Sequence, residues 1–473
     1  SGGTIYDNAG ERGGGVYVGS KGTFVFEKGS VSYNYADNGG GIFVDTDGVF
    51  TMASGIIGGN TEGAANTAKF GGGVYTKGDC TMSGDAAVSS NKAISSGEIT
   101  NKDGHGGGVY IESGTFVLSG NAKVSGNMAK YGGGVSFFTE DTSASFTMSD
   151  SAAVSGNTAV SYGGIAVLGG SFTMESGKVM LNKATEGSAG GVGVGNGGSF
   201  TMQGGIISGN QARSTNEPEG GGVMCGVYHG DYADTSKVDA TGTFTMTGGS
   251  ISGNTAGSGC NGGGVYADIN ANVTLSGAPV ITGNSDTNGT VNNAYLNKDE
   301  VYGEGGTFIG KGGLAIGADI GVTVDAGRLP TTDGGYTTIA EAAEGYTITA
   351  DDAKRLSADA GTGYSVRQKD NTLVLVKGEL PHEHPICGAA HKDINGHTGA
   401  CADVTWTAWD GVSDITYDAN NTAYVYLRDN AERDSALEIA NGYTLYLCLN
   451  GYSLTMKAEG EVISVTGSFT PTD

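Results

Sequence analysis

Residues 163–182 read GGIAVLGGSFTMESGKVMLN, and this stretch contains the three parts that decide the fold. Two glycines precede an aliphatic run, Phe172-Thr173-Met174 follows, and a third apolar segment ends at Asn182. Alternate side chains of an extended strand share one face, so Phe172 and Met174 point one way and Thr173 points the other. The stretch therefore predicts three short strands, each with an apolar face, joined at glycine turns.

The same unit recurs through residues 1–284. Its glycine runs begin at Gly13, Gly39, Gly71, Gly106, Gly132, Gly163, Gly190, Gly220 and Gly262. The shortest period, from Gly13 to Gly39, is 26 residues, enough for three short strands and their turns. An asparagine closes each unit, at Asn8, Asn34, Asn60, Asn91, Asn127, Asn157, Asn182, Asn210, Asn254 and Asn284.

Repeats of this length predict an all-β solenoid, a right-handed three-faced parallel β-helix whose coils stack about 4.8 Å apart. Glycine permits the positive φ angles that the corners require. An asparagine at the same place in every coil can stack on its neighbours. It can also bond backbone groups that would otherwise be buried without partners.

Composition and charge exclude other classes of protein. Of 473 residues, 89 are glycine and 6 are proline, but glycine does not occupy every third position as collagen requires. The net charge of −25 repels nucleic acid and anionic lipid, so neither is expected as a partner. The chain has no run of about 18 apolar residues, so no membrane insertion is expected.

These repeats resemble those of chlamydial polymorphic outer-membrane proteins. They are more similar to the Gly-rich, pectin-lyase-like β-helices of adhesin-type surface proteins in gut Firmicutes. The resemblance rests on the Gly-Gly-aliphatic pairs and the recurring asparagines in residues 1–284. It implies a bacterial protein located at the cell surface or outside the cell.

The composition divides the chain into four regions. We expect the regular β-helix over 1–284, irregular last coils and a cap over 285–378, and a His/Cys-rich linker over 379–401. Residues 402–473 contain a Cys448-Leu449-Asn450-Gly451 segment similar to the opening coils of pectin-lyase-like β-helices, and we expect a second β-helix to start here. Both chain ends resemble cut points within a longer protein.

The linker concentrates potential metal ligands, namely His382, His384, Cys387, His391, His397 and Cys401. Thiolates and imidazoles form closed tetrahedral zinc sites, which stabilise segments without a core of their own. The alternative is a Cys387–Cys401 disulfide beside solvated histidines, which an exported protein permits. His382-Glu383-His384 differs from the zincin motif, whose histidines lie four residues apart, so zinc would be structural. No other cofactor is expected.

Aromatic side chains recur at one outward position after the glycine runs, at Tyr17, Phe43, Tyr75, Tyr110 and Tyr266. Stacked aromatic rings on a rigid sheet suit sugar rings or a partner protein, so these residues form a candidate binding face. The alternative is ordinary strand propensity, because aromatic residues favour pleated surfaces.

The function expected from these features is non-enzymatic. We expect an adhesin-like surface or stalk protein whose loops and exposed face contact host glycans, host proteins or neighbouring cells. Gly104-His105-Gly106 matches a polygalacturonase-like motif, but no pair of carboxylates recurs on one face, so no catalytic residue is assigned. The alternatives are a glycan-acting lyase or hydrolase, and a structural subunit that self-associates into extracellular fibres.

The linker yields a direct test of zinc against the disulfide. We expect about one zinc per chain and free thiols at Cys387 and Cys401. Elemental analysis of protein purified without chelator, together with mass measurement under non-reducing conditions, gives both quantities. A metal-free chain with the mass deficit of one disulfide at these two residues would leave only the covalent alternative.

Overall fold

The computed structural model describes residues 2–59, 62–95, 103–139, 141–213, 220–226, 242–268, 271–296, 306–378, 382–384, 389–391, 406–427, 429–449, 452–457 and 460–471. The chain divides into two compact units. The first contains Ser1–Arg328, Thr338–Gly361 and Gln368–Val374, and the second contains Leu329–Thr337, Thr362–Arg367 and Leu375–Asp473. Among the described residues, no helix is long and apolar enough to span a membrane.

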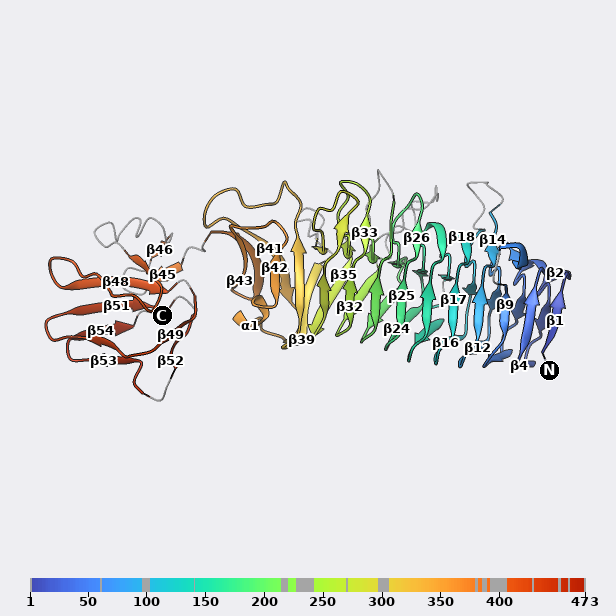
Figure 1. Ribbon diagram of the computed structural model, residues 1–473, viewed down its shortest axis with the longest axis horizontal. Helices are drawn as coiled ribbons and strands as arrows, with labels where there is room; N and C mark the ends of the chain where they lie inside the picture. Colours follow the sequence, from blue (N-terminus) through green and yellow to red (C-terminus); the bar gives the residue numbers. More distant parts are fainter. Residues whose placement is uncertain are drawn as a thin grey trace. The chain divides into compact units, whose positions relative to one another are not determined.

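The first unit is a parallel β-helix in which each strand pairs with its equivalent in the next coil (Figure 1). The first ladder follows the glycine runs and contains β3 (Val16–Val18), β7 (Ile42–Val44), β11 (Val74–Thr76), β15 (Val109–Ile111), β19 (Val135–Phe138), β23 (Ile165–Leu168), β27 (Val192–Gly195), β30 (Val223–Cys225), β34 (Val265–Ala267) and β38 (Ala294–Leu296). The second ladder contains β4 (Thr23–Phe26), β8 (Val49–Met52), β12 (Asp79–Met82), β16 (Thr115–Leu118), β20 (Ser145–Met148), β24 (Ser171–Met174), β28 (Ser199–Met202), β31 (Thr243–Met246), β35 (Asn272–Gly277) and β39 (Gly306–Leu314).

The other two ladders lie on either side of the recurring asparagines. The third precedes them and contains β1 (Gly3–Tyr6), β5 (Gly29–Ser32), β9 (Ile56–Gly58), β13 (Ala87–Ser89), β17 (Lys123–Ser125), β21 (Ala153–Ser155), β25 (Lys178–Met180), β29 (Ile206–Ser208), β32 (Ser250–Ser252), β36 (Val280–Thr282), β40 (Asp319–Thr323) and β42 (Leu356–Ala358). The fourth follows them with short strands β2 (Ala9–Arg12), β6 (Tyr35–Asn38), β10 (Thr67–Ala68), β14 (Lys92–Ala93), β18 (Met128–Tyr131), β22 (Thr158–Ser161), β26 (Lys183–Ala184), β33 (Thr255–Ala256) and β37 (Ser285–Asp286). The repeat predicted three strands per coil. The structure has a fourth, short strand at the corner that follows the asparagine.

The second ladder confirms the predicted alternation of buried and outward side chains. Phe146, Phe172, Phe200 and Phe244 are paired in register and at most 1% exposed. Their rings stack between coils, with centroids 4.7 Å apart and planes 6° apart for Phe172 and Phe200. Cys80 takes the place of a phenylalanine in this column and is also buried. The parallel β-helix and its core are therefore confirmed.

A continuous chain of asparagine amides runs through the coils. In each coil the side-chain nitrogen donates to the amide oxygen of the next asparagine, for example Asn127 Nδ2 to Asn157 Oδ1 at 3.0 Å. Asn127 Nδ2 also donates to Val88 O at 3.0 Å, while its backbone N–H donates to Asn157 Oδ1 at 2.9 Å. Every polar atom of these buried amides is thereby bonded, as the sequence predicted.

One member of this chain differs from the prediction. The repeat assigned Asn60 to the series, but Asn66 occupies the position, fully buried, and its Nδ2 donates to Asn91 Oδ1 at 2.9 Å. A short 3-10 turn, η1 (Glu62–Ala64), precedes Asn66 and lengthens this coil. The prediction was wrong because an insertion at a corner moves the asparagine along the sequence without moving it in space.

The chain of amides ends on a carboxylate near the last coils. Asn284 bonds Asn293, and Asn293 donates from N and Nδ2 to the two oxygens of Asp359, each at 2.8 Å. The chain after β40 also contains β41 (Tyr336–Ala342), α1 (Ala350–Ala353), β43 (Tyr364–Lys369) and β44 (Thr372–Lys377). The helix is short, because the chain returns to a strand at β42.

The second unit contains three further sets of parallel pairs. They involve β47 (Thr407–Trp409), β48 (Thr422–Leu427), β51 (Thr444–Cys448) and β54 (Ser468–Pro471); β49 (Ala431–Arg433) with β52 (Leu454–Met456); and β50 (Leu437–Ile439) with β53 (Ile463–Val465). A core that includes Trp409, Leu427 and Leu445 packs inside them. These parallel pairs form a second, shorter set of ladders. An antiparallel pair, β45 (His382–His384) and β46 (Ala389–His391), lies earlier in the unit.

The alternation in the second ladder predicts a contrast between adjacent residues. Phe200→Ala should leave a cavity that costs about 3–5 kcal/mol, whereas Thr201→Ala, on the half-buried outer side, should cost well under about 1 kcal/mol. Urea unfolding followed by circular dichroism measures both changes. Equal losses for the two variants would contradict the assigned facing.

Candidate functional site

The predicted binding face is a column of rings on the first ladder. Tyr17, Phe43, Tyr75 and Tyr110 are paired in register through β3, β7, β11 and β15. The ring centroids of Phe43 and Tyr75 lie 4.8 Å apart with planes 20° apart, and those of Tyr75 and Tyr110 lie 5.0 Å apart with planes 42° apart. The column therefore stacks as the sequence predicted.

The predicted exposure of this column is wrong for most of its members. Tyr17 is 50% exposed, but Phe43, Tyr75, Tyr110 and Tyr266 are each at most 9% exposed. These side chains do point away from the interior of the coil. They are buried because other side chains on the outside of the sheet cover them.

The covering side chains belong to the residue immediately before each glycine run. Phe70, His105 and Tyr131 form this second column, and parallel bridges link Asn38 to Phe70, Phe70 to His105, and His105 to Tyr131. Each residue lies against the first column of the following coil: the ring centroids of Phe70 and Tyr110 are 5.2 Å apart. The covering column is visible in the sequence as aromatic residues directly before the glycine runs. Strand alternation does not predict it, because these residues precede the strands of the first ladder.

Farther along the coils the two columns exchange large and small side chains. The first column becomes Ser136, Ala166 and Gly193, while the second column supplies Tyr131 and Tyr162, both nearly fully buried. A Cβ atom on Gly193 would overlap the ring of Tyr162. The glycine is therefore required by the tyrosine of the preceding coil.

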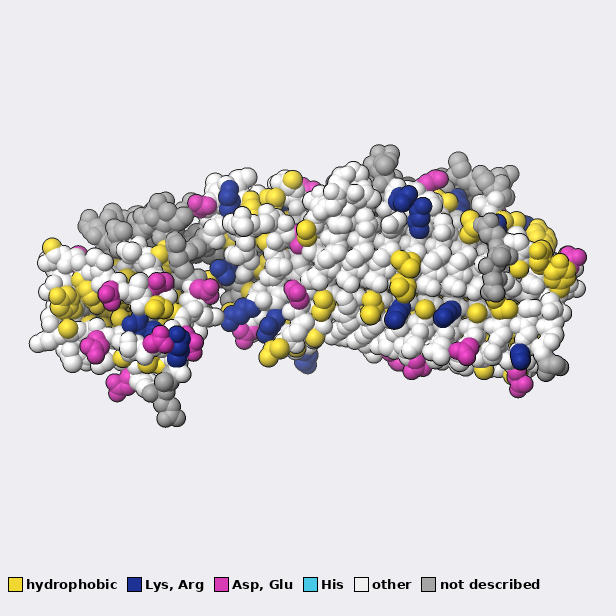
Figure 2. Space-filling model, in the orientation of Figure 1, with side chains coloured by type: hydrophobic (Ala, Val, Ile, Leu, Met, Phe, Trp, Pro, Cys, Tyr) yellow, Lys and Arg dark blue, Asp and Glu magenta, His cyan; other side chains and the backbone are white. Residues whose placement is uncertain are grey.

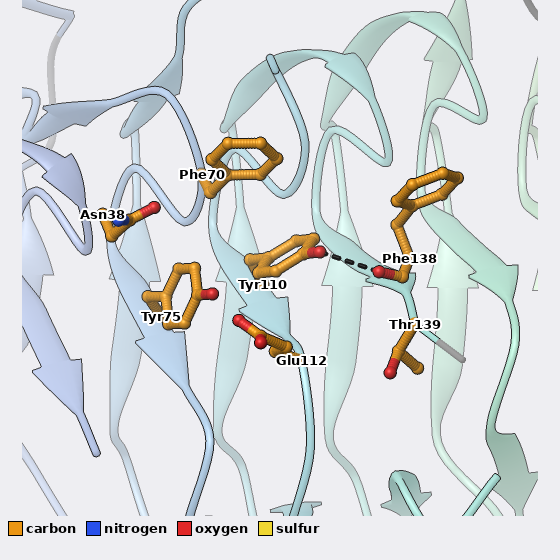
Figure 3. Close-up of a pocket in the computed structure, with 7 residues that line it drawn as sticks. All are labelled: Asn38, Phe70, Tyr75, Tyr110, Glu112, Phe138 and Thr139. Atoms are coloured by element: carbon orange, nitrogen blue, oxygen red, sulfur yellow. Dashed lines mark hydrogen bonds between the residues drawn. The ribbon is translucent and has the colours of Figure 1, made fainter. Parts of the chain in front are cut away.

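A pocket of about 330 Å³ opens where the first column still carries rings (Figure 3). It is lined by Asn38, Phe70, Tyr75, Tyr110, Glu112, Phe138 and Thr139. Four of these residues are aromatic, and Figure 3 shows Tyr110 between Phe70 and the carboxylate of Glu112. The hydroxyl of Tyr110 donates to the carbonyl oxygen of Phe138 at 2.8 Å, which fixes one ring to the far wall.

Two residues after three of the rings, the chain carries the charged side chains of Asp45, Lys77 and Glu112. Tyr17 donates its hydroxyl proton to Asp45 Oδ2 at 2.6 Å, and Lys77 Nζ lies 3.0 Å from Glu112 Oε1. Burial raises the pKa of Glu112 above its ordinary value, while the positive charge of Arg12 opposes this shift. The pocket thus combines aromatic faces with one partly desolvated carboxylate.

His105 of the polygalacturonase-like motif is enclosed behind this pocket. It is fully buried, its ring centroid lies 4.8 Å from that of Tyr131 and 4.9 Å from that of Phe138, and its Nδ1 is 3.2 Å from Ser136 Oγ. Burial, followed by the nearby charge of Lys130, lowers the pKa of His105 to about 3. The imidazole is therefore neutral and part of the aromatic packing.

The predicted zinc ligands fall outside the described residues or are described by their backbone alone. Cys387, His397 and Cys401 are outside the described ranges. The backbone of His382 pairs with that of His391, which brings two candidate ligands opposite each other. Within the described ranges, no group of three or more His, Cys, Asp or Glu side chains is placed to bind one metal ion. The zinc site and its disulfide alternative stay predictions.

The buried imidazole predicts a measurable pH dependence of stability. The pKa of His105 is lower in the folded chain than in the unfolded chain. The unfolded chain therefore binds the extra proton, and folding loses roughly 1.4 kcal/mol per pH unit as the pH falls from about 6.5 towards 3. His105→Phe should remove this part of the pH dependence. Urea unfolding midpoints at neutral and mildly acidic pH measure it, and an unchanged difference between the two pH values would contradict the assignment.

No protein-family model, curated protein or solved structure matches this chain.

Proposed function

We propose that this chain is a non-enzymatic, adhesin-like surface or stalk protein that acts outside the cell and binds a surface-borne ligand. The ligand would be carried by host or bacterial glycans or proteins. The observation that supports the proposal is the aromatic pocket lined by Phe70, Tyr75, Tyr110 and Phe138. Four aromatic side chains line this partly open hollow, and ligand sites are commonly lined by aromatic side chains together with a few polar groups.

The rigidity of the coils supports recognition by a preformed site. Tyr75 and Tyr110 lie on strands that are paired to both neighbouring coils, so their backbone is held in register without a ligand. A preformed site avoids the entropic cost of ordering loops on binding. On the side of the molecule in Figure 2, charges of both signs are scattered over the described surface of the coils.

The chemistry of the pocket favours binding over turnover. Glycoside hydrolysis needs two carboxyl groups across the scissile bond, and the pocket lining contains one, that of Glu112. Glu112 is paired with Lys77, and the neighbouring His105 is buried and neutral. A lyase or hydrolase is therefore the less supported alternative.

A second candidate function is a structural subunit of an extracellular fibre. The observation that favours it is the second set of parallel ladders, β47 to β54, in the same chain. Tandem solenoids are suited to span distance, since each coil contacts only its neighbours.

Binding of the full chain to arrays of glycans and glycoproteins tests the proposal. We expect retention of the chain without release of sugar products. Phe70→Ala should weaken this binding at least about tenfold through loss of one aromatic wall. Tyr17→Ala is the matched control, because Tyr17 belongs to the first column with Tyr75 and Tyr110 but is not part of the pocket lining. Released sugars would favour the enzyme, and end-to-end assembly without binding would favour the fibre.

A further inference from the structure

The residue before each buried asparagine forms a corner with a left-handed backbone. Its φ angle lies between 57° and 67° at Asp7, Tyr33, Ser90, Gly126, Gly156, Leu181, Gly209, Gly253 and Gly283. Such angles favour glycine, because a Cβ atom crowds the following carbonyl oxygen, and five of these corners carry it. A bulky residue adopts this backbone only rarely, so Tyr33 and Leu181 are exceptions that need an explanation.

Packing does not explain a bulky side chain at this corner. A Cβ atom added at Gly156, Gly253 or Gly283 would meet nothing within 4 Å beyond the adjacent residues, so the corner directs its side chain away from the coils. Accordingly, Tyr33 is 46% exposed and Leu181 is 63% exposed. A strained backbone whose side chain gains little burial indicates a role at the surface.

Tyr33 belongs to a group of exposed rings on the first two coils. Its ring centroid lies 4.8 Å from that of Tyr6 in the preceding coil, and the two ring planes are inclined by 57°. Tyr6 is 53% exposed, and Tyr35, two residues after Tyr33, is 46% exposed. Figure 2 shows hydrophobic side chains gathered at the end of the coils that carries β1 and β2. Unlike the buried Tyr75 and Tyr110, these rings leave much of their surface accessible to a ligand.

Polar groups lie beside these exposed rings. Asp7 occupies the same corner one coil before Tyr33 and is exposed, and among the described residues its carboxylate has no hydrogen-bond or ion-pair partner. On the adjoining strands, Ser30 Oγ donates to Thr4 Oγ1 at 3.1 Å. An aromatic face beside a free carboxylate suits a sugar, whose ring has an apolar C–H face and hydroxyl donors at its rim. The net charge of −25 repels anionic sugars, which favours a neutral one.

We propose that Tyr6, Tyr33 and Tyr35 form a second binding site, which takes neutral glycans. Sugar rings stack on the tyrosine faces, and sugar hydroxyls donate to the carboxylate of Asp7. The site goes beyond the proposed function, because it shares no residue with the pocket lining. It also accounts for the backbone at Tyr33, since glycine would relieve the strain but would remove the ring.

Printed arrays of neutral glucans, galactans and mannans, with uronate-containing polymers beside them, test the proposal on the full chain. We expect retention on neutral glycans, at least about tenfold stronger than on the uronate-containing ones. Saturation-transfer NMR with an oligosaccharide of the best-retained polymer then reports the contact. The strongest transfer should reach the carbon-bound protons on one face of the sugar ring, because that face lies on the tyrosines.

A matched pair of variants separates binding from folding. Tyr33→Gly introduces the residue that five equivalent corners carry, so the urea midpoint should stay the same or rise. Binding of neutral glycans should fall at least about tenfold, because the ring is lost. Leu181→Gly makes the same backbone change at an equivalent corner and should leave glycan binding unchanged. Tyr33→Phe keeps an aromatic face and should retain most of the binding.

Three outcomes would overturn this site: no retention on neutral glycans, retention that Tyr33→Gly leaves unchanged, or an equal loss with Leu181→Gly. The pocket is tested separately by Phe70→Ala. If Phe70→Ala abolishes array binding and Tyr33→Gly does not, the proposed function stands and the second site is wrong. If Tyr33→Gly abolishes binding and Phe70→Ala does not, the tyrosine site stands and the pocket is not the binding site.

Discussion

Every face of this β-helix depends on the register between coils, and the buried asparagine amides hold that register. Each amide accepts from the preceding coil and donates to the next, so a coil shifted by one residue would leave several buried polar groups unpaired. A one-residue shift would also turn the apolar faces outward. The phenylalanine stack, the ring column and the pocket all follow from this constraint, because each needs equivalent side chains at the same height in successive coils.

The regular coils could be predicted because the same few residues recur with the same spacing. Phe172, Thr173 and Met174 give the facing of a strand, and the glycines and asparagine mark its corners. The prediction failed where a coil departs from the repeat. Asn60 has the expected spacing, yet Asn66 makes the bonds, because the inserted turn changes the length of the chain between two fixed points. Spacing alone cannot distinguish an insertion before the asparagine from one after it.

The candidate site could be predicted only in part. Strand alternation correctly gave the direction of Tyr75 and Tyr110, but it describes a side chain relative to its own strand. Burial also depends on what the preceding coil places over that side chain, as Phe70 does over Tyr110. The motif around His105 suggested chemistry, whereas its surroundings make the imidazole a packed, neutral ring. The cysteines and histidines of 379–401 predict a zinc site or a disulfide, and the metal content of the purified chain tests which of the two forms.

The exchange of volume between Tyr162 and Gly193 has a consequence for how such coils can be inherited or recombined. The residue before a glycine run contacts the first ladder of the following coil: Arg12 with Phe43, Phe70 with Tyr110, and Tyr162 with Gly193. A cut made at the glycine runs would yield intact sequence repeats but would separate these partners. The unit that can be duplicated or transplanted without a clash is therefore offset from the visible repeat, because it must carry both members of each pair across the boundary between two coils.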